Sequence, residues 1–576
     1  MTEIDLTPIK IALEPYIAQG RTALIPALHA AQEVYGYLPK LVAAEVARAL
    51  KIPLADVFGV IDFYAMFYRE PVGKTVVQVC GDPACALAGA DHLLEQFSQS
   101  SKNHQTGGDM PPAVTIERSA CLGLCSHAPA ALSGGKPVSR ADAYTFDELT
   151  AGDIPVPQTL IGGTLRLLTA NCSAGHPLSL TEYQAQGGYE SLKNALSQSP
   201  EAVIAEVKAS GLVGRGGAAF PTGVKWEGTA HAEGTPKYVI CNADEAEPGT
   251  FKDRVLLEND PHSILEGLMI AAYAVGAAQG YIYIRGEYLR AYQIMKNAIE
   301  EARQVHLLGE TILGSDFSFD VELRRGAGAY VCGEETALFE SIEGKRGFPR
   351  VKPPFPTTYG LFGKPTAINN VETLANIPLI MRLGAEAYRK IGTEKSPGPK
   401  LFCLSGDVAR PGLYEVPFGI TFRELLFDLA GGIAAGHTFQ AALFGGAAGA
   451  FATAENLDVR LTFEDLRSAG LPLGSGAITV LDETRDLRDV CLRLAHFFAE
   501  ESCGKCYPCQ MGTQRQLEIL QRVVEGKLLP GDMQRLQDTG WTMSDASLCG
   551  LGQTAASAIL SAINHWPELF QPVAAG

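Results

Sequence analysis

The stretch that decides the fold of the middle of the chain reads Arg324-Arg-Gly-Ala-Gly-Ala-Tyr-Val-Cys-Gly-Glu-Glu-Thr336. Residues 319–323 before it predict a strand, and residues 336–342 after it have the apolar spacing of a helix. A glycine-rich turn in that position lets a helix N-terminus face a bound anion. On propensity alone, Glu334 and Glu335 cap the helix instead. The stretch predicts an α/β unit with a candidate ligand site at its turn.

The same alternation of strand and helix patterns extends over residues 160–395 and predicts further strands at 237–242 and 279–285. The first of these leads into Asn242-Ala-Asp-Glu-Ala-Glu-Pro-Gly249, a turn with three carboxylates and an amide. Ribose hydroxyls or a flavin edge suit such acceptors, and a solvated acidic turn is the alternative. The spacing alone does not choose between these two interpretations.

A second glycine-rich segment, Gly214-Arg-Gly-Gly-Ala-Ala219, fits the dinucleotide pattern G-x-G-x-x-G/A. A dinucleotide-binding loop follows a strand, whereas the helical stretch 201–210 precedes this one. Arg215 and Lys225 flank the glycines and favour a phosphate ligand, because glycines let backbone amides approach and the cations neutralise charge. A flexible loop is the alternative.

Two sets of four cysteines flank the α/β region, and each provides the ligand count of an iron–sulfur cluster. The first set is Cys80, Cys85, Cys121 and Cys125. The second set is Cys503, Cys506, Cys509 and Cys549. Zinc also binds four cysteines, usually as two separated pairs. The contiguous triplet of the second set therefore favours a [4Fe–4S] cluster, whereas the spacing of the first set fits zinc as well as [2Fe–2S].

The length of 576 residues predicts several domains. The expected units are, in order, a helical region at 1–73, a β-rich unit at 74–150, the α/β region at 160–395, an α+β module at 396–480 and a helical tail at 481–576. Further strands are expected at 74–79, 114–117, 400–406 and 477–481, a surface loop at 99–112 and a linker at 149–160.

The composition is that of a globular protein with a formal net charge of −17, which argues against nucleic acid or an anionic membrane as the main partner. The most apolar run, residues 267–278, is shorter than the roughly 20 residues of a spanning helix, and the start shows no signal-peptide pattern. We therefore expect a cytoplasmic location, where thirteen cysteines indicate metal or redox chemistry. The cysteines outside the two sets are expected to be buried small residues: Cys172, Cys241, Cys332, Cys403 and Cys491.

Six segments together resemble a known family: 214–226, 242–254, 281–288, 326–338, 352–356 and 367–373. With the second cysteine set, they resemble the flavin subunit of respiratory complex I over residues 160–576. Residues 1–150 resemble the thioredoxin-like [2Fe–2S] subunit of the same complex. Fused in this order, the two parts resemble the diaphorase subunit of the cytoplasmic NAD-reducing [NiFe] hydrogenase. Ala219 departs from the pattern, because the family usually has glycine there.

The resemblance implies a multidomain α/β fold. Its parts are a helical bundle with a thioredoxin-like ferredoxin, a Rossmann-like FMN- and NADH-binding domain, a β-grasp module and a C-terminal helical bundle that holds a [4Fe–4S] cluster. The first cysteine set then holds [2Fe–2S]. By the resemblance, FMN is held by Gly214, Arg215, Gly216, Gly217, Lys225, Asn242, Asp244, Glu245, Gly333, Glu334, Asn369, Asn370 and Thr373. NADH is held by Phe220, Glu247, Tyr330, Glu335, Lys352 and Phe355.

The implied function is electron exchange between NADH and the clusters through FMN, because a flavin takes up a hydride and releases single electrons. No catalytic side chain is expected, since the flavin carries the hydride step. The implied partners are iron–sulfur and hydrogenase subunits of a redox complex. The alternatives are the flavin subunit of a molybdenum or tungsten formate dehydrogenase, a complex I-type subunit, and a non-catalytic electron-transfer scaffold. NADH is expected over NADPH, because Glu247 near the ribose would repel a 2′-phosphate.

Overall fold

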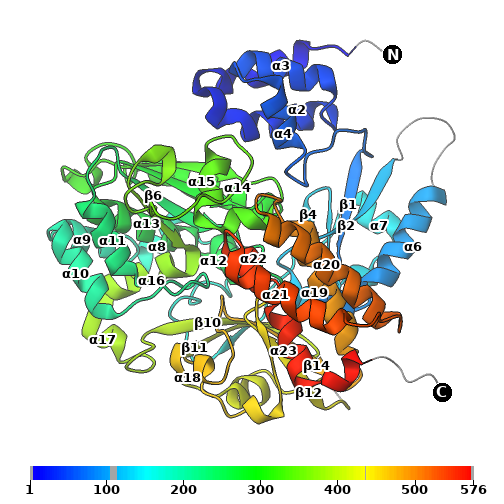
Figure 1. Cartoon of the computed structure of the whole chain (residues 1–576). Coiled ribbons are helices and arrows are strands. Elements are labelled where there is room, and N and C mark those ends of the chain that lie inside the picture. Colours follow the sequence, from blue (N-terminus) through cyan, green and yellow to red (C-terminus); the bar gives the residue numbers. More distant parts are fainter. Residues whose placement is uncertain (1–3, 104–112, 435, 572–576) are drawn as a thin grey trace.

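The computed structural model describes residues 4–103, 113–434 and 436–571 (Figure 1). They form three β-sheets with helical regions at both ends of the chain. The strands expected at 74–79, 114–117, 237–242, 279–285, 319–323, 400–406 and 477–481 are all confirmed, with ends that differ by at most two residues. Within the described residues, no helix combines the length and the apolar character needed to cross a membrane.

Helices α1 (Thr7–Leu13), α2 (Leu24–Tyr35), α3 (Lys40–Leu50) and α4 (Leu54–Ile61) form an N-terminal bundle, drawn in blue at the top of Figure 1. Buried side chains of this bundle belong to one hydrophobic core that also includes the stretch 327–342 and the C-terminal helices. The N-terminal bundle and the C-terminal helices therefore share one core with residues from the middle of the chain.

The second unit contains a four-stranded sheet in the order β2 (Val114–Ser119), β1 (Thr75–Cys80), β3 (Ala131–Ser133) and β4 (Lys136–Val138). Strand β1 runs parallel to β2 and antiparallel to β3. Helix α6 (Ala90–Asn103) lies between β1 and β2 in sequence. The surface loop expected at 99–112 is wrong for residues 99–103, which extend α6, and its remainder lies outside the described residues.

The central sheet is parallel and has the order β8 (Asp320–Arg325), β7 (Gln279–Ile284), β6 (Tyr238–Ala243) and β9 (Thr366–Asn370). Strands β6 to β8 progress toward one edge, whereas β9 is added on the other side of β6. The carboxyl ends of β6 and β9 therefore flank a point where the strand order reverses. In open parallel sheets, ligands bind outside such a point.

Seven helices connect or cover these strands: α10 (Pro200–Ser210), α11 (Thr222–His231), α12 (Lys252–Asn259), α13 (Pro261–Val275), α14 (Leu289–Gln304), α15 (Glu335–Ile342) and α16 (Val371–Leu383). Helix α13 contains most of the apolar run at 267–278 and is almost entirely buried. The run is therefore a core helix, as expected.

The third sheet has the order β13 (Ala450–Ala452), β12 (Phe439–Phe444), β14 (Ala477–Asp482), β10 (Pro399–Gly406), β11 (Gly412–Pro417) and β5 (Ile161–Gly163). Its strands from β10 onward lie in the yellow module at the bottom of Figure 1. Strand β5 pairs with β11, although it precedes the central sheet in sequence. Of the linker expected at 149–160, residues 149–151 still belong to α7 (Phe146–Ala151), whereas residues 153–160 are irregular.

The C-terminal region is helical, as expected, and contains α19 (Leu487–Glu501), α20 (Tyr507–Val524), α21 (Asp532–Ala546), α22 (Gly550–Thr554) and α23 (Ser557–His565). Figure 1 shows these helices in orange and red beside the β1–β2 sheet and above the module. The elements that carry the two cysteine sets therefore both pack against other parts of the molecule.

Candidate functional site: two cysteine sets around a glycine-lined turn region

The first cysteine set is gathered at the carboxyl end of β1. Cys80 is the last residue of β1, Cys85 lies in α5 (Pro83–Leu87), and Cys121 and Cys125 follow β2. All of them are buried and free. The Cys121 and Cys125 sulfurs lie 3.4 Å apart, well beyond the roughly 2.05 Å of a disulfide bond.

The second cysteine set lies at two helix N-termini. Cys503, Cys506 and Cys509 stand before and within the first turn of α20, and Cys549 is the residue before α22. The four side chains line one cavity with Pro349 and Lys505. Cys509 is buried, whereas the other three are partly exposed.

The distances between sulfurs separate clusters from zinc. Tetrahedral zinc with Zn–S bonds of about 2.3 Å requires all four sulfurs to lie about 3.8 Å apart. Among the residues that the structure describes, which include both sets, no three of these sulfurs lie within 4.8 Å of one another. Neither set therefore has the sulfurs arranged as a tetrahedral zinc site requires.

Two buried arginines of the central domain bind the loop of the first set. Arg285 donates from Nη2 to the Cys121 carbonyl (2.6 Å) and from Nη1 to the Glu245 carbonyl (2.6 Å). Arg254 donates from Nε to the Gly123 carbonyl (3.0 Å). One guanidinium therefore joins the cluster loop directly to the acidic turn after β6. Sequence reasoning assigned neither arginine a role, although both lie in segments that carry the family resemblance.

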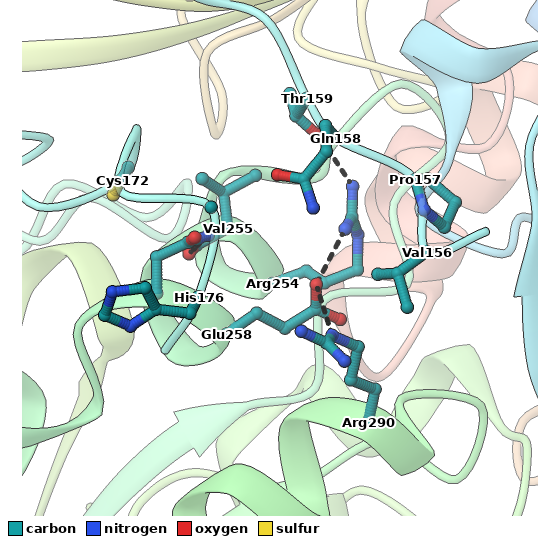
Figure 2. A pocket seen from close by; sticks show the side chains of 12 residues that line it. Val156, Pro157, Gln158, Thr159, Cys172, His176, Arg254, Val255, Glu258 and Arg290 are labelled. Carbon is teal, nitrogen blue, oxygen red and sulfur yellow. Dashed lines mark hydrogen bonds and ion pairs between the residues drawn. The ribbon is translucent and has the colours of Figure 1, made fainter. Parts of the chain in front are cut away.

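Arg254 also fixes the segment that joins the two domains (Figure 2). Its Nη2 donates to Thr159 Oγ1 (3.2 Å), and its Nη1 pairs with Glu258 Oε2 (3.2 Å). Figure 2 shows Glu258 between Arg254 and Arg290, whose Nε lies 3.8 Å from the same carboxylate oxygen. Thr159, at the end of the segment 156–159, is therefore held against α12 by one charge-assisted hydrogen bond.

The glycine-rich segment 214–219 lies beside the end of β9. The Arg215 amide donates to Thr373 Oγ1 (2.8 Å). The Arg215 guanidinium, however, is buried against the Phe418 ring and donates to the Pro397 carbonyl (2.8 Å). The Nε and Nη1 atoms of this guanidinium are buried without a hydrogen-bond partner among the described residues. That the cation neutralises a phosphate therefore stays a prediction.

Ala219 has a φ of +52°. Residues with a Cβ avoid this left-handed region, which costs roughly 1–2 kcal/mol, whereas glycine does not. The conformation explains why a glycine suits this position.

The turn after β6 and the end of β9 form the wall of the candidate flavin site. Asn242 donates to the Gly333 carbonyl (2.8 Å). Asn370 donates to Asp253 Oδ2 (2.6 Å), and Asn369 accepts from the Trp226 indole (2.9 Å). These amides are thus already oriented by protein partners on three different elements.

Glu245 serves the fold with its side chain. Its two carboxylate oxygens accept from the Asp253 and Arg254 amides (2.9 Å each) at the start of α12. Burial raises the pKa of Glu245 to about 7. The carboxylate therefore faces the start of α12.

The two halves of the stretch 324–336 make different contacts. The Ala327 and Gly328 carbonyls accept from the Met66 and Ala65 amides of the segment that follows the N-terminal bundle (3.0 and 3.1 Å). The second half reaches α15, where the Glu334 carboxylate accepts from the Ala337 amide (2.9 Å). Glu334 therefore caps α15, as its propensity indicates, and Glu335 does not.

The residues expected to hold NADH occupy an exposed charged border. Lys352 Nζ lies 2.8 Å from a Glu334 oxygen and 2.7 Å from a Glu335 oxygen. Lys225 Nζ lies 5.9 Å from the Phe220 ring centre and donates to the Ile368 carbonyl (2.9 Å). The Phe220 and Phe355 rings are exposed. Exposed aromatic rings beside cations suit an adenine and a diphosphate.

Glu247 lies deeper, between the central domain and the module. Its Oε2 accepts from the Tyr330 hydroxyl (2.5 Å) and its Oε1 from the Ala448 amide (3.0 Å). Burial raises the pKa of Glu247 to about 7, although these donors favour the ionised form. The module thus contributes a contact to Glu247 that sequence reasoning missed, because Ala448 and Glu247 are far apart in sequence.

The donor and acceptor set fits a flavin. Asp244 Oδ2 is buried and has no hydrogen-bond partner within the described residues, and burial raises the pKa of Asp244 well above its usual range. A buried acceptor without a donor is rare in folded proteins and indicates a missing polar partner. The flavin ring carries an N–H group, and the surrounding amides and glycines match its polar edge and phosphate.

The remaining cysteines behave as expected. Cys172, Cys241, Cys332, Cys403 and Cys491 are buried and free. All thirteen cysteines lie within the described residues, and none of them forms a disulfide.

Three protein-family models match the chain. They are the thioredoxin-like [2Fe–2S] ferredoxin over residues 9–152, the Nuo51 FMN-binding domain over 207–379 and the NADH-ubiquinone oxidoreductase-F iron–sulfur binding region over 489–572. The matched ranges contain both cysteine sets and the glycine-rich segments. The expected multidomain fold and its FMN, [2Fe–2S], [4Fe–4S] and NADH ligands are confirmed at this level.

Relatives with similar sequences are subunits of redox complexes. The NADH-quinone oxidoreductase F 2 subunit of Rhizobium meliloti (strain 1021) is 48% identical over 69% of this chain and 94% of that protein. The NADP-reducing hydrogenase subunit HndC of Solidesulfovibrio fructosivorans is 47% identical over 71% of this chain and 83% of that protein. A chain of an H2-reduced NAD+-reducing [NiFe]-hydrogenase crystal structure is 33% identical with a TM-score of 0.84, over 96% of this chain and 94% of that chain.

Proposed function

Because the chain belongs to the family of F-type subunits of NADH-quinone oxidoreductase, and so is an NADH-binding flavin and iron–sulfur oxidoreductase subunit, we propose that it is the diaphorase subunit of an NAD-reducing [NiFe] hydrogenase. In this role it exchanges electrons between NAD(H) and the hydrogenase subunits of one complex. The cytoplasmic location expected from the sequence stays a prediction.

The length of the structural match supports this proposal most strongly. The hydrogenase chain corresponds to 96% of this chain, including the N-terminal bundle and the first cysteine set. The R. meliloti relative covers only 69% of it. A fusion of both parts in one order is therefore shared with the hydrogenase chain.

We assign the FMN phosphate and ring to the turns at 214–217, 242–245 and 333–334 and to the end of β9. When bound there, FMN supplies the conversion between hydride transfer and single-electron transfer. The chain supplies position: Thr373 fixes the turn at Arg215, Asn242 ties β6 to Gly333, and Asp244 offers a free acceptor. Fixed orientation is the main rate term that protein residues contribute to such a step.

We assign NADH to the border formed by Phe220, Lys352, Phe355, Glu335 and the deeper pair Tyr330 and Glu247. Aromatic rings stack on the adenine, the Lys352 ammonium binds phosphate, and Glu247 accepts from ribose hydroxyls. The position of the glutamate inside the turn makes a 2′-phosphate unfavourable, because two anions would meet in a buried place.

The test is the metal content of the native complex that contains this chain. The complex is isolated under native conditions, its subunits are identified by mass spectrometry, and nickel, molybdenum and tungsten are measured. Nickel in stoichiometric amount supports the proposal. Molybdenum or tungsten would assign the chain to a formate dehydrogenase instead. The absence of all three metals would leave a complex I-type role, the second candidate, which the 48% identity to the R. meliloti relative favours.

A further inference from the structure

The six-stranded module has no assigned role, yet one of its loops contacts the turn after β6 that contains Glu247. Residues 445–449 connect β12 to β13 and contain Gly445, Gly446 and Gly449. The Ala448 amide of this loop donates to Glu247 Oε1 (3.0 Å). A carboxylate that we assign to NADH is therefore held by a domain other than the flavin domain.

Glycine is required at the point of contact. Gly446 has a φ of +78°, and a Cβ built on it would lie 2.5 Å from Glu247 Cγ. Real Cβ atoms essentially never come this close. Any side chain at residue 446 therefore displaces the glutamate or the loop.

The rest of the same turn also rests on the module. The Thr250 and Ser475 hydroxyl oxygens lie 2.7 Å apart, and the Phe251 amide donates to Cys403 Sγ (3.3 Å). A Cβ on Gly249 would lie 3.2 Å from Ala477 Cβ. The turn is thus seated on β10, β14 and the loop before β14, not on one hydrogen bond.

Buried charges keep the module in place. Lys400 of β10 lies with its Nζ 2.7 Å from Glu372 Oε2 of α16, and Lys252 of α12 lies 3.2 Å from the same oxygen. All three side chains are fully buried. Breaking such a network leaves an uncompensated buried charge, so the module behaves as a fixed wall of the site.

We propose that the module is a positioning element for the nicotinamide nucleotide: its loop 445–449 orients Glu247 and thereby sets the affinity for NADH and the preference over NADPH. The proposal rests on the role of Glu247 under the proposed function. Two of the acceptor positions of Glu247 are used by Tyr330 and Ala448, and the remaining ones then point in one defined direction toward the ribose. Loop 445–449 consists of positioning residues in this proposal, because it acts on NADH only through Glu247.

The test compares Gly446→Ala with Gly470→Ala in the purified holoprotein. Both glycines lie in the module at positive φ (+78° and +72°), so the backbone strain is matched, but a Cβ on Gly470 meets no atom within 4 Å. For Gly446→Ala we expect the KM for NADH to rise about fivefold or more, as loss of about 1 kcal/mol of a charged hydrogen bond requires, with kcat within twofold. Flavin content and both cluster EPR signals stay normal, and Gly470→Ala keeps the KM within twofold.

A double-mutant cycle with Glu247→Ala separates positioning from general damage. If loop 445–449 acts through Glu247, Gly446→Ala changes the KM less than twofold in the Glu247→Ala background, because contacting residues are not additive. Equal effects in both backgrounds, or an unchanged KM in folded Gly446→Ala, would overturn the proposal. If Gly446→Ala does not fold, Ser475→Ala tests the same seat, with an expected two- to threefold rise in KM, and an unchanged KM there counts against it. A wild-type holoprotein that binds FMN but does not oxidise NADH would refute the proposed function instead.

Discussion

The two cysteine sets differ in how they are built into the molecule. In the first set every cysteine is at most 5% exposed, and its loop is bound by Arg254 and Arg285 of the neighbouring domain. In the second set three cysteines are partly exposed, and Tyr507 between two of them is 74% exposed. One site is enclosed by the chain itself, and the other opens to the surface.

The difference indicates different tasks. Electrons that leave for another subunit need a site that a partner can approach, and only the second set offers one. The first set contacts the turn after β6 instead: its cavity is lined by Cys80, Cys85 and Cys125 together with Pro248 and Gly249. We infer that the second set is the exit from the chain and the first set is an internal station.

Removing one ligand from each set gives the largest expected contrast. Cys549→Ser should abolish the [4Fe–4S] EPR signal and reduce electron transfer to the partner subunits to background, because the exit is lost. Cys121→Ser should abolish only the [2Fe–2S] signal and leave most transfer to the partner. EPR spectra of the reduced proteins and NADH-driven partner reduction measure both effects.

Reduction of a small artificial acceptor that reacts at the flavin serves as the internal control for these variants. It should persist in both of them. If Cys121→Ser stops partner reduction as completely as Cys549→Ser, the two sites are in series and the contrast is wrong.

Replacing Arg285 tests whether its contacts with the loop of the first cysteine set stabilise the folded chain. Arg285→Met removes a donor from the Cys121 and Glu245 carbonyls, of which the second keeps the Tyr288 hydroxyl (3.3 Å), and leaves Glu287 without its charge partner. Breaking a buried pair costs about 3–5 kcal/mol, and we expect the denaturant midpoint of the chain to fall accordingly.

Arg423→Met is the matched control for this variant. The Arg423 pair with Asp458 is exposed (47% and 73%), so its loss should leave the denaturant midpoint nearly unchanged. A similar fall in the denaturant midpoint of both variants would show that Arg285 stabilises the fold no more than an exposed ion pair does.

A bulky oxidant should distinguish the two cysteine sets in the wild-type protein, because their exposure differs. We expect ferricyanide to destroy the [4Fe–4S] signal on the order of ten times faster than the [2Fe–2S] signal, since exposed sulfur sites react first. The signals are followed by EPR after timed exposure. Tyr507→Ala should accelerate only the loss at the second set; acceleration at both sets, or at neither, would argue against control by exposure.

The smallest expected effect concerns pH at the turn beside the first set. Burial raises the pKa of Glu247 to about 7, so this carboxyl is protonated below pH 7 and ionised above it. Since a charged acceptor binds ribose hydroxyls about 1 kcal/mol more strongly than a neutral one, the KM for NADH should rise about fivefold from pH 8 to pH 6. In Glu247→Gln the profile should be flat, and a pH dependence that survives this change belongs to another group.

Local sequence predicted the elements and the cysteine sets well, because strand alternation and ligand spacing are local properties. It did not indicate the side-chain partners of Arg215 and Glu245, which are the Pro397 carbonyl and the α12 amides. Nothing near either residue in sequence announces those partners. The expected surface loop at 99–103 failed for a related reason, since polar residues also continue the exposed face of α6.

Contacts between domains were beyond local reasoning. Arg285 meets Cys121 across 164 positions, and Ala448 meets Glu247 across 201. The available signal was the placement of Arg254 and Arg285 inside segments that carry the family resemblance, which marks them as constrained without saying by what. Only the folded arrangement shows that they bind main-chain carbonyls of another domain.

The short irregular segment at 153–160 has a consequence for how these domains meet. It tethers the first cysteine set to the domain whose arginines bind it, so the encounter is intramolecular, with an effective concentration of about millimolar for a short linker. Under such a tether, a few hydrogen bonds from Arg254 and Arg285 suffice to hold a geometry that two separate chains would need a large interface to maintain. Because the two domains belong to one chain, this surface does not need to provide binding affinity between them. It only has to align the first cysteine loop with the domain that binds it.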